Sequence, residues 1–349
     1  MRFNRVALAG IAYELPPNVV ESSALDDRLA PVYAALGLGP RQIEPLTGVR
    51  ERRFWNPGQP MAEAAGRAAN QLINRLDFDP ARIGAVVYAG VCRDQIEPAT
   101  ACAVADAIGV APRAFVYDVS NACLGAMNAA LQIASAIELG QIQAGLVVCA
   151  ETARQIVDLT IDRMLARRDM ETFKTSLATM TGGSGAIAML LVNDDLAREG
   201  ASRILGGVAR QETRHHRLCR WGPDTGHPAS APMVMETHAV AVMENGVRLG
   251  VETWRDLLAE MEWSANPDRV VCHQVGAANR DAVLKALRVD PATDYSTFPF
   301  LGNIGTVSLP ITAAIAAERG HLETGHSVAF LGIGSGLNCV MLGVNWGRL

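Results

Sequence analysis

Aromatic residues are scarce in this chain, because Phe, Trp and Tyr together make up only 5% of its 349 residues. The core must therefore be filled by Ala, Val, Leu, Ile and Met, which fits a buried α/β architecture better than an aromatic-rich β-sandwich. Charged residues are also few, at 19%, whereas hydrophobic residues reach 49%. That balance excludes an intrinsically disordered protein. The length allows roughly two to three domains, or one large duplicated domain.

The sequence has no excess of positive charge, since its formal net charge is -5. A chain of this charge lacks the basic surface that binds a nucleic-acid backbone. It also lacks any run of 18 uninterrupted apolar residues, so we expect no membrane-spanning helix. The first 18 residues contain one short apolar run followed by Glu and two prolines, which indicates a first strand rather than a signal peptide.

The seven cysteines are odd in number and show no CxxC spacing. We therefore predict free thiols and a cytoplasmic protein rather than a disulfide framework. His215, His216 and Cys219 form a local cluster, but no partner pair stands at ligand spacing, which argues against a metal site. The glycine-rich turns do not follow the GxGxxG pattern of nucleotide loops. We expect no cofactor.

The remaining pattern alternates strands and helices. Apolar runs predict strands at 6–15, 81–91, 114–120 and 143–151, and helical spacing covers 61–76, 98–109 and 121–140. Continuous apolar strands separated by helices indicate an α/β sheet that is covered on both faces.

A Gly-Ser-Gly turn followed by an apolar strand occurs twice, at 183–192 and at 334–344. The offset, 334 − 183 = 151, is close to half the chain. We interpret this repeat as two similar halves, an N-terminal half at 1–200 and a C-terminal half at 201–349. The charged helical segment 151–180 has no counterpart in the second copy, so we read it as an insertion in the first half.

Residues 207–232 break the periodicity, because polar residues, Pro and Gly dominate them. This composition predicts a loop or lid. Its positive charge comes from Arg210, Arg214, Arg217 and Arg220. Two interpretations stay open, a binding surface for a phosphate-bearing substrate and an ordinary solvated loop.

Three residues are candidates for chemistry. Cys123 stands between a predicted strand and the predicted helix 121–140, where the helix dipole favours a thiolate nucleophile. Taken alone it could equally be an inert core cysteine. His273 follows a short apolar strand, and Asn303 lies between glycines ahead of a helix. Each of these two is weak evidence by itself.

Taken together and in order, the motifs are more specific. They are a strand-turn-Cys-helix, His-Gln at 273–274, GNIGTVSLP at 302–310 and GIGSG at 332–336, with GVRERRFW at 48–55. The chain thereby resembles the thiolase superfamily, in its ketoacyl synthase III branch, over essentially its whole length. The position of Cys339 after the glycine turn differs from that of the second cysteine of a degradative thiolase.

The resemblance implies a duplicated five-layer αβαβα fold and a homodimer. It also implies that Cys123 is acylated and that His273 and Asn303 hydrogen-bond a thioester carbonyl. The backbone amides of Cys123 and Ser335 would form the other oxyanion hole. A Claisen condensation needs such donors at two developing oxyanions.

One departure from ordinary ketoacyl synthase III is informative. In the segment VCRDQIEPATA (91–101) the residue before Pro98 is Glu97, where that branch has an apolar residue that reaches the partner's acyl pocket. A carboxylate facing the acyl thioester suggests proton abstraction from an unactivated Cα. Apolar surroundings would raise its pKa toward useful basicity. The competing interpretation is a helix-start acid stabilised by the dipole.

With Glu97, the pattern resembles the OleA family, whose members join two fatty acyl-CoA molecules head to head without decarboxylation. Such condensation yields a 2-alkyl-3-ketoacid in bacterial olefin and β-lactone biosynthesis. The substrates would be acyl-CoA or acyl-carrier-protein thioesters. Where the synthase III branch has an aromatic residue and an Arg for the CoA adenine, this chain has Glu44, Pro45 and Leu46, so the carrier stays undecided. Small residues near the Cys123 helix favour medium or long acyl chains.

Other functions stay open on the sequence. They are a decarboxylating 3-oxoacyl synthase III, a ketosynthase-like acyltransferase, a hydroxymethylglutaryl-CoA synthase-like enzyme, and a non-catalytic partner of a heterodimeric ketosynthase. The intact set of Cys123, His273 and Asn303 favours an enzyme.

Overall fold

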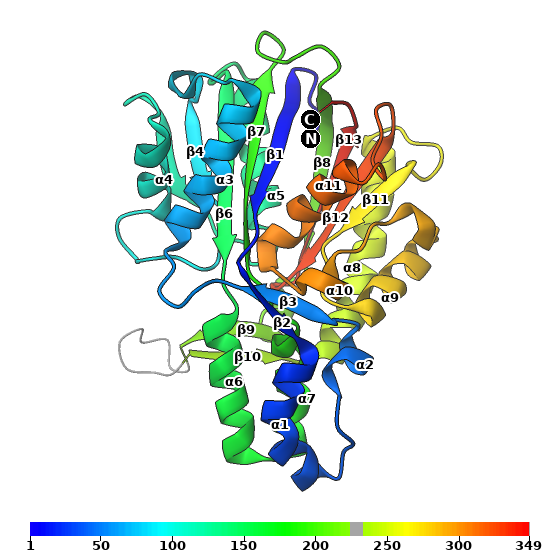
Figure 1. The fold of residues 1–349 in the computed structure, drawn as a ribbon. Helices are drawn as coiled ribbons and strands as arrows, with labels where there is room; N and C mark the ends of the chain where they lie inside the picture. The colour runs from blue at the N-terminus through cyan, green and yellow to red at the C-terminus, as the bar shows by residue number, and fades with distance from the viewer. Residues whose placement is uncertain (224–232, 349) are drawn as a thin grey trace.

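A nine-stranded mixed sheet dominates the computed structural model, which describes residues 1–223 and 233–348 (Figure 1). The strand order is β11-β12-β13-β8-β1-β7-β6-β4-β5. In chain order these strands are β1 (Val6–Glu14), β4 (Ala85–Tyr88), β5 (Phe115–Asp118), β6 (Ala144–Glu151), β7 (Gly185–Asn193), β8 (Ser202–Gln211), β11 (Arg269–Cys272), β12 (Ser327–Gly334) and β13 (Asn338–Asn345). Two small sheets pair β2 (Asn18–Glu21) with β3 (Glu51–Phe54) and β9 (Cys219–Pro223) with β10 (Met233–Thr237).

The helices fall between these strands. They are α1 (Ser22–Leu36), α2 (Ile43–Thr47), α3 (Met61–Leu76), α4 (Thr100–Ile108), α5 (Gly125–Glu138), α6 (Arg154–Arg167), α7 (Met170–Ser176), α8 (Ala239–Glu260), α9 (Ala277–Leu287), α10 (Phe298–Leu301) and α11 (Ser308–Glu318). Short 3₁₀ turns occur at 80–82, 177–181, 213–215, 291–293 and 305–307.

The sheet consists of two similar halves. The order β1-β7-β6-β4 in the first half is repeated as β8-β13-β12-β11 in the second. In each half the last two strands of that order are parallel and the other neighbours are antiparallel. The halves join where β1 pairs with β8. In the described part of the second half, no strand of the sheet corresponds to β5. The prediction of a duplicated α/β fold is confirmed.

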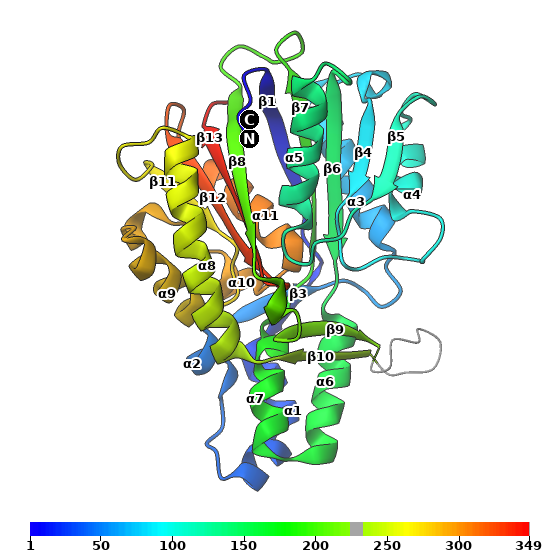
Figure 2. The ribbon, with the colours of Figure 1, turned by 180° about the vertical axis from the view of Figure 1, so that it is seen from behind.

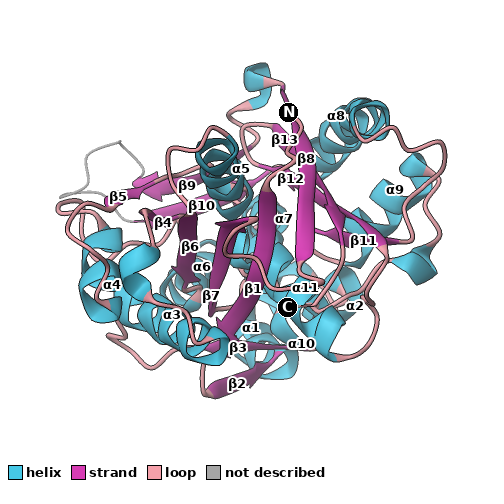
Figure 3. Ribbon diagram, turned by 90° about the horizontal axis from the view of Figure 1, so that it is seen from above, coloured by secondary structure: helices cyan, strands magenta, loops and turns pink. Residues whose placement is uncertain are grey.

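The helices add three layers to the two half-sheets. In the first half of the sheet, α3 covers the near face of Figure 1 and α5 covers the opposite face, which Figure 2 shows. In the second half, α11 covers the near face and α8 the opposite face. Seen from above, α3 and α8 lie on opposite outer sides of the molecule (Figure 3). One continuous core contains residues of both α5 and α11 together with strands of both halves. The order of layers is therefore αβαβα, with α5 and α11 in the middle.

Small side chains let these layers approach closely. A Cβ on Gly125, the first residue of α5, would collide with the carbonyl oxygen of Ala89. A Cβ on Gly145 of β6 would collide with Ile133 of α5. The low aromatic content found in the sequence thus has a structural counterpart in Ala- and Gly-mediated packing.

A smaller cap lies below one end of the sheet and contains α1, α6, α7 and the β9–β10 hairpin (Figure 1). Its own apolar cluster includes Leu25, Leu29, Val157, Ile161 and Phe173. The segment 151–180, read from the sequence as an insertion, supplies α6 and α7 to this cap. The cap faces the carboxyl ends of β4, β5 and β6, the edge where α/β proteins commonly bind ligands.

Two local expectations differ from the structure. The helix expected over 121–140 begins only at Gly125, so Cys123 lies in the turn before it. The expected loop 207–232 is partly strand, because 207–211 complete β8 and 219–223 form β9, while 224–232 lie outside the described residues. Polar strands such as these give no apolar run in the sequence, since sheet pairing rather than core burial specifies them. Among the described residues, no helix is long and apolar enough to cross a membrane.

Candidate active site

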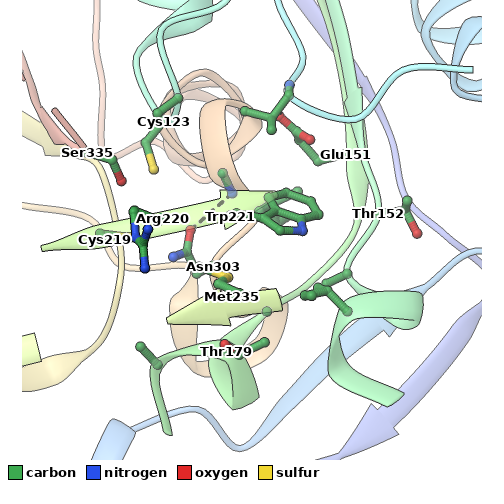
Figure 4. Close-up of a pocket in the computed structure, with 18 of the residues that line it drawn as sticks. Cys123, Glu151, Thr152, Thr179, Cys219, Arg220, Trp221, Met235, Asn303 and Ser335 are labelled. Carbon is green, nitrogen blue, oxygen red and sulfur yellow. Dashed lines mark hydrogen bonds between the residues drawn. The ribbon is translucent and has the colours of Figure 1, made fainter. Parts of the chain in front are cut away.

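Cys123 lies in a tight turn between β5 and α5. The preceding residue, Ala122, has a positive φ of 46°, and Asn121 forms an isolated β-bridge with Cys123. The turn brings the sulfur to the wall of a cavity of about 460 Å³ between the sheet and the cap (Figure 4). A left-handed alanine is strained, which is a feature that clusters at functional sites.

Two backbone amides face the sulfur of Cys123. Burial, together with the neighbouring Cys219 and Glu151, raises the pKa of the Cys123 thiol to about 12, although the amides of Ser335 and of Cys123 itself act in the opposite direction. Ser335 belongs to the Gly-Ser-Gly turn between β12 and β13 and also lines the cavity. The sequence prediction paired these same two amides.

Asn303 lines the same cavity and is held by three hydrogen bonds. Its backbone amide donates to the carbonyl of Thr181, and its own carbonyl accepts from the amide of Gly183, both at 2.8 Å. Its Oδ1 accepts from the amide of Gly305 at 3.0 Å, the contact drawn in Figure 4. This leaves the Nδ2 group of Asn303 available to donate to a substrate oxygen.

His273 opens into a second, smaller cavity of about 110 Å³, which is lined mainly by apolar residues, several of them on α8, while α9 contributes Asn279, Arg280 and Val283. The two cavities share Ala178. Both ring nitrogens of His273 are buried without a hydrogen-bond partner. Burial lowers the pKa of His273 to about 4, so the imidazole is neutral at pH 7. The structure therefore places His273 next to the Cys123 cavity but not in its lining.

Glu97 lies outside both cavities of this chain. It is exposed on the loop between β4 and α4, next to Ile96, whose side chain is 84% exposed. The Glu97–Pro98 peptide bond is cis. The helix-start interpretation places Glu97 just ahead of α4, which begins at Thr100.

The four arginines of the segment 207–232 lie apart from one another in the structure. Arg220, on β9, lines the cavity of Cys123 and lies 3.7 Å from Glu236. Arg214 is exposed and pairs with Glu212 at 3.3 Å, and Arg217 is exposed. Arg210 forms ion pairs with Asp256 and Glu252 of α8.

Sequence reasoning missed Glu151, which ends β6 and lines the cavity with only 4% of its surface exposed. Its carboxylate accepts hydrogen bonds from the amides of Val91 and Cys92 at 2.8 and 3.0 Å. Burial raises the pKa of Glu151, and these donors lower it. A charged residue at the carboxyl end of a buried strand was the available signal.

Sequence reasoning also missed Trp221 and Met235, which face each other across the β9–β10 hairpin and close the cavity opposite the sheet (Figure 4). No sequence signal located them, because the hairpin itself was not expected. In the described residues, no group of three His, Cys, Asp or Glu side chains is arranged to hold a metal ion. The absence of a metal remains a prediction.

Known proteins resemble this chain along its whole length. An acyl-CoA:acyl-CoA alkyltransferase of Shewanella oneidensis is 49% identical over 99% of this chain and 100% of that relative. The enzyme of the same name from Xanthomonas campestris is 34% identical over the same shares. A crystal structure of cerulenin-bound X. campestris OleA superposes with a TM-score of 0.93, at 34% identity, and covers 99% of this chain and 98% of that chain.

The chain belongs to the OleA family. The broader match agrees, because the family of 3-oxoacyl-[acyl-carrier-protein] synthase III matches residues 117–208 and the C-terminal family of that synthase matches residues 261–346. A β-ketoacyl-[acyl-carrier-protein] synthase III of Rhodospirillum rubrum is 29% identical over 95% of this chain and 96% of that relative. This OleA-family protein is therefore a thiolase-superfamily acyltransferase, as the motifs predicted.

Proposed function

We propose that the protein condenses two fatty acyl-CoA molecules without decarboxylation, through an acyl-Cys123 intermediate. The product is a 2-alkyl-3-ketoacid, and the two CoA groups leave in the acylation step and in a final hydrolysis. The observation that carries this proposal is the convergence of Cys123, Asn303 and the Ser335 amide on one cavity in a chain of the OleA family. Such a reaction belongs to hydrocarbon-type lipid biosynthesis.

Acylation begins with the thiol of Cys123. Because burial raises the pKa of the Cys123 thiol to about 12, the thiol must lose its proton as it attacks the thioester. That proton passes to the departing sulfur of CoA, while the neutral imidazole of His273, in the neighbouring cavity that shares Ala178, stays able to donate a hydrogen bond. The tetrahedral oxyanion accepts hydrogen bonds from the amides of Cys123 and Ser335, and CoA leaves as its thiol.

Condensation then requires a carbanion on the second acyl-CoA. Glu97 removes a proton from its Cα, and the enolate oxygen accepts hydrogen bonds from Asn303 Nδ2 and from His273. The carbanion attacks the carbonyl carbon of acyl-Cys123. The oxygen of that carbonyl accepts hydrogen bonds from the amides of Cys123 and Ser335. The attack forms the carbon–carbon bond, and collapse of the tetrahedral intermediate breaks the carbon–sulfur bond to Cys123. This step releases the Cys123 thiolate and a 3-ketoacyl-CoA, whose thioester is then hydrolysed.

Glu97 reaches this chemistry from a second copy of the chain. β5 is an edge strand of the sheet, and its Phe115 and Tyr117 side chains are 66% and 38% exposed. An open edge with apolar side chains favours pairing with another chain. In a homodimer joined through β5, the loop carrying Ile96 and Glu97 would enter the partner's cavity.

The cavity dimensions support a fatty acyl substrate. Its volume of about 460 Å³ lies within the usual range for ligand pockets, and small residues such as Ala153, Ala178 and Gly182 line it. Trp221 and Met235 close its far side, so they would set the longest chain accepted. Arg220 is the one arginine of the 210–220 segment placed to meet a phosphate-bearing carrier, either CoA or acyl carrier protein. The seven free cysteines fit a cytoplasmic location.

One experiment tests this proposal. The protein is mixed with a single long-chain acyl-CoA and no malonyl thioester, and the intact mass and the organic extract are analysed. We expect one acyl group on Cys123, none on Cys123→Ala, and a ketone formed by spontaneous decarboxylation of the ketoacid. Condensation that occurs only with malonyl thioester would instead identify a decarboxylating synthase. Absence of any acyl-enzyme would indicate a non-catalytic partner subunit.

A further inference from the structure

The two amides that face Cys123 come from opposite halves of the chain, and one side chain connects them. Asn338, at the start of β13, donates from Nδ2 to Asn121 Oδ1 at 2.7 Å and to the carbonyl of Ser335 at 2.8 Å. Asn121 and Asn338 are 217 positions apart in the sequence. Asn121 precedes the Cys123 turn by two residues, and Ser335 supplies the second amide.

We propose that Asn338, through Asn121, is a positioning residue that sets the spacing of the two oxyanion-hole amides. The inference rests on the proposed function, because it assigns a role within that acyl-transfer site. An oxyanion hole acts only when both donors are fixed at hydrogen-bond distance from the developing charge. A bridge between the two donor segments supplies that constraint directly.

Two glycines of the turn before β13 leave room for the close packing around the Asn121–Asn338 contact. Gly336 has a positive φ of 140°, and a Cβ at this position would collide with the Nδ2 of Asn338. A Cβ on Gly334 would press on Cys123 and Leu124, so the glycine turn packs directly on the nucleophile segment. The amide of Asn338 therefore occupies space that Gly336 leaves open.

The Cys123 turn also needs an external constraint. Ala122 has a left-handed φ of 46°, a conformation that alanine adopts only where the surroundings enforce it. Asn121 receives its hydrogen bond from Asn338 and donates from Nδ2 to Oδ1 of Asn128 on α5, at 2.5 Å. The three side chains thus connect β13, the Cys123 turn and the first turns of α5. Asn338 donates to Asn121, which in turn donates to Asn128.

Asn338 does not line the cavity, whereas Ser335 and Gly336 do. It therefore has no direct contact to offer a substrate bound there, and its effect must pass through the amides. Loss of the bridge should slow the step that develops an oxyanion much more than it slows alkylation of the thiol, and it should leave substrate binding unchanged. This separation distinguishes a positioning role from a general structural one.

The test compares two reactions of the same sulfur. Acylation by a long-chain acyl-CoA requires the oxyanion hole, whereas alkylation by iodoacetamide requires the thiolate but forms no oxyanion. Both rates are measured for the full-length wild type, Asn338→Leu, Asn121→Leu and the double variant. Asn193→Leu serves as the control, because Asn193 is a buried asparagine with a side-chain hydrogen bond at the far end of β7.

We expect the acylation rate at saturating acyl-CoA to fall about 10- to 100-fold in Asn338→Leu and Asn121→Leu. The half-saturating acyl-CoA concentration should stay at the wild-type value, and the alkylation rate should fall far less than the acylation rate. The double variant should slow acylation by less than the product of the two single effects, because all three variants remove the Asn121–Asn338 contact. The control variant should acylate normally.

Two results would overturn the inference. One is a wild-type acylation rate in Asn338→Leu, and the other is an equal fall in acylation and alkylation, which would mean that the whole turn is displaced. If Asn338→Leu does not fold, Asn338→Asp keeps the size but cannot donate, and Asn121→Leu removes the contact from its other end. A wild type that is not acylated at all would contradict the proposed function itself.

Discussion

The hydroxyl of Thr306 accepts a hydrogen bond from the backbone amide of Ala126 at 2.6 Å. Leu124, the residue that caps α5, offers no side-chain acceptor of its own. Thr306 follows Asn303 on the same loop, so the loop that carries Asn303 caps the helix that follows Cys123. This contact fixes two walls of the cavity relative to each other and satisfies one of the free amides at the helix start.

Replacing this capping hydroxyl should cost stability. Thr306→Val keeps the shape but leaves the Ala126 amide buried and unpaired, so we expect a loss of about 1–3 kcal/mol in the free energy of unfolding. Urea denaturation measures it. Thr100→Val is the matched control, because the Thr100 hydroxyl is buried without a partner. Equal losses in the two variants would contradict a capping role.

Glu97→Gln should separate the two chemical steps. The variant keeps the size of the side chain but cannot accept a proton from Cα, so Cys123 should still be acylated while condensation slows by about 10²- to 10⁴-fold. Intact mass and product analysis measure the two steps. Gln95→Ala, on the same exposed loop, is the control. Condensation at the normal rate would leave Glu97 as a helix-start acid, and loss of acylation would assign it a structural role.

Alkylation of Cys123 should increase with pH without reaching a plateau in the neutral range. Burial raises the pKa of this thiol to about 12, so the thiolate fraction should increase about tenfold per pH unit between about pH 7 and pH 10. Iodoacetamide labelling followed by peptide mapping measures the rate, with the exposed Cys102 as an internal comparison. A plateau near pH 7 would show that the free enzyme holds a stabilised thiolate.

Removal of His273 should reduce the loss of stability in acid. Burial lowers the pKa of His273 from 6.5 to about 4, so between these values the unfolded chain takes up a proton that the folded chain does not. The contribution of this pKa difference to the free energy of unfolding is fully present above pH 6.5. It falls by about 3 kcal/mol as the pH decreases toward 4. His273→Asn should flatten the dependence of the unfolding free energy on pH in this window. An unchanged slope would contradict a buried neutral imidazole.

Helices with a clear apolar face could be predicted closely from the sequence. The range 61–76 is found as α3, because its alanines and leucines recur at helical spacing while Glu63 and Arg67 point outward. The start of α5 was placed too early. Nothing in the residues around Ala122 reports a positive φ, since Asn121 and Gly125 fit a helix as well as a turn.

The candidate site was only partly accessible to sequence reasoning. Motif order identified Cys123, Asn303 and Ser335, and the structure places them around one cavity, while their roles remain predictions. Glu151, Trp221 and the Asn121–Asn338 contact were not found. Glu151 had a signal in its place at the end of a buried strand. Trp221 and the Asn121–Asn338 contact depend on the pairing of separate segments, and their spacing carries no periodic signal.

The middle helices determine how the molecule can come apart. α11 is buried all round from Ser308 to Ala316, and it packs against β1 and β7 of one half and β11 and β12 of the other. α5 likewise packs against strands of both halves. Neither half can then bury its apolar surface without the other, although the chain is built as a repeat. The repeat should therefore melt in a single cooperative transition, and a fragment ending near residue 200 should aggregate rather than fold.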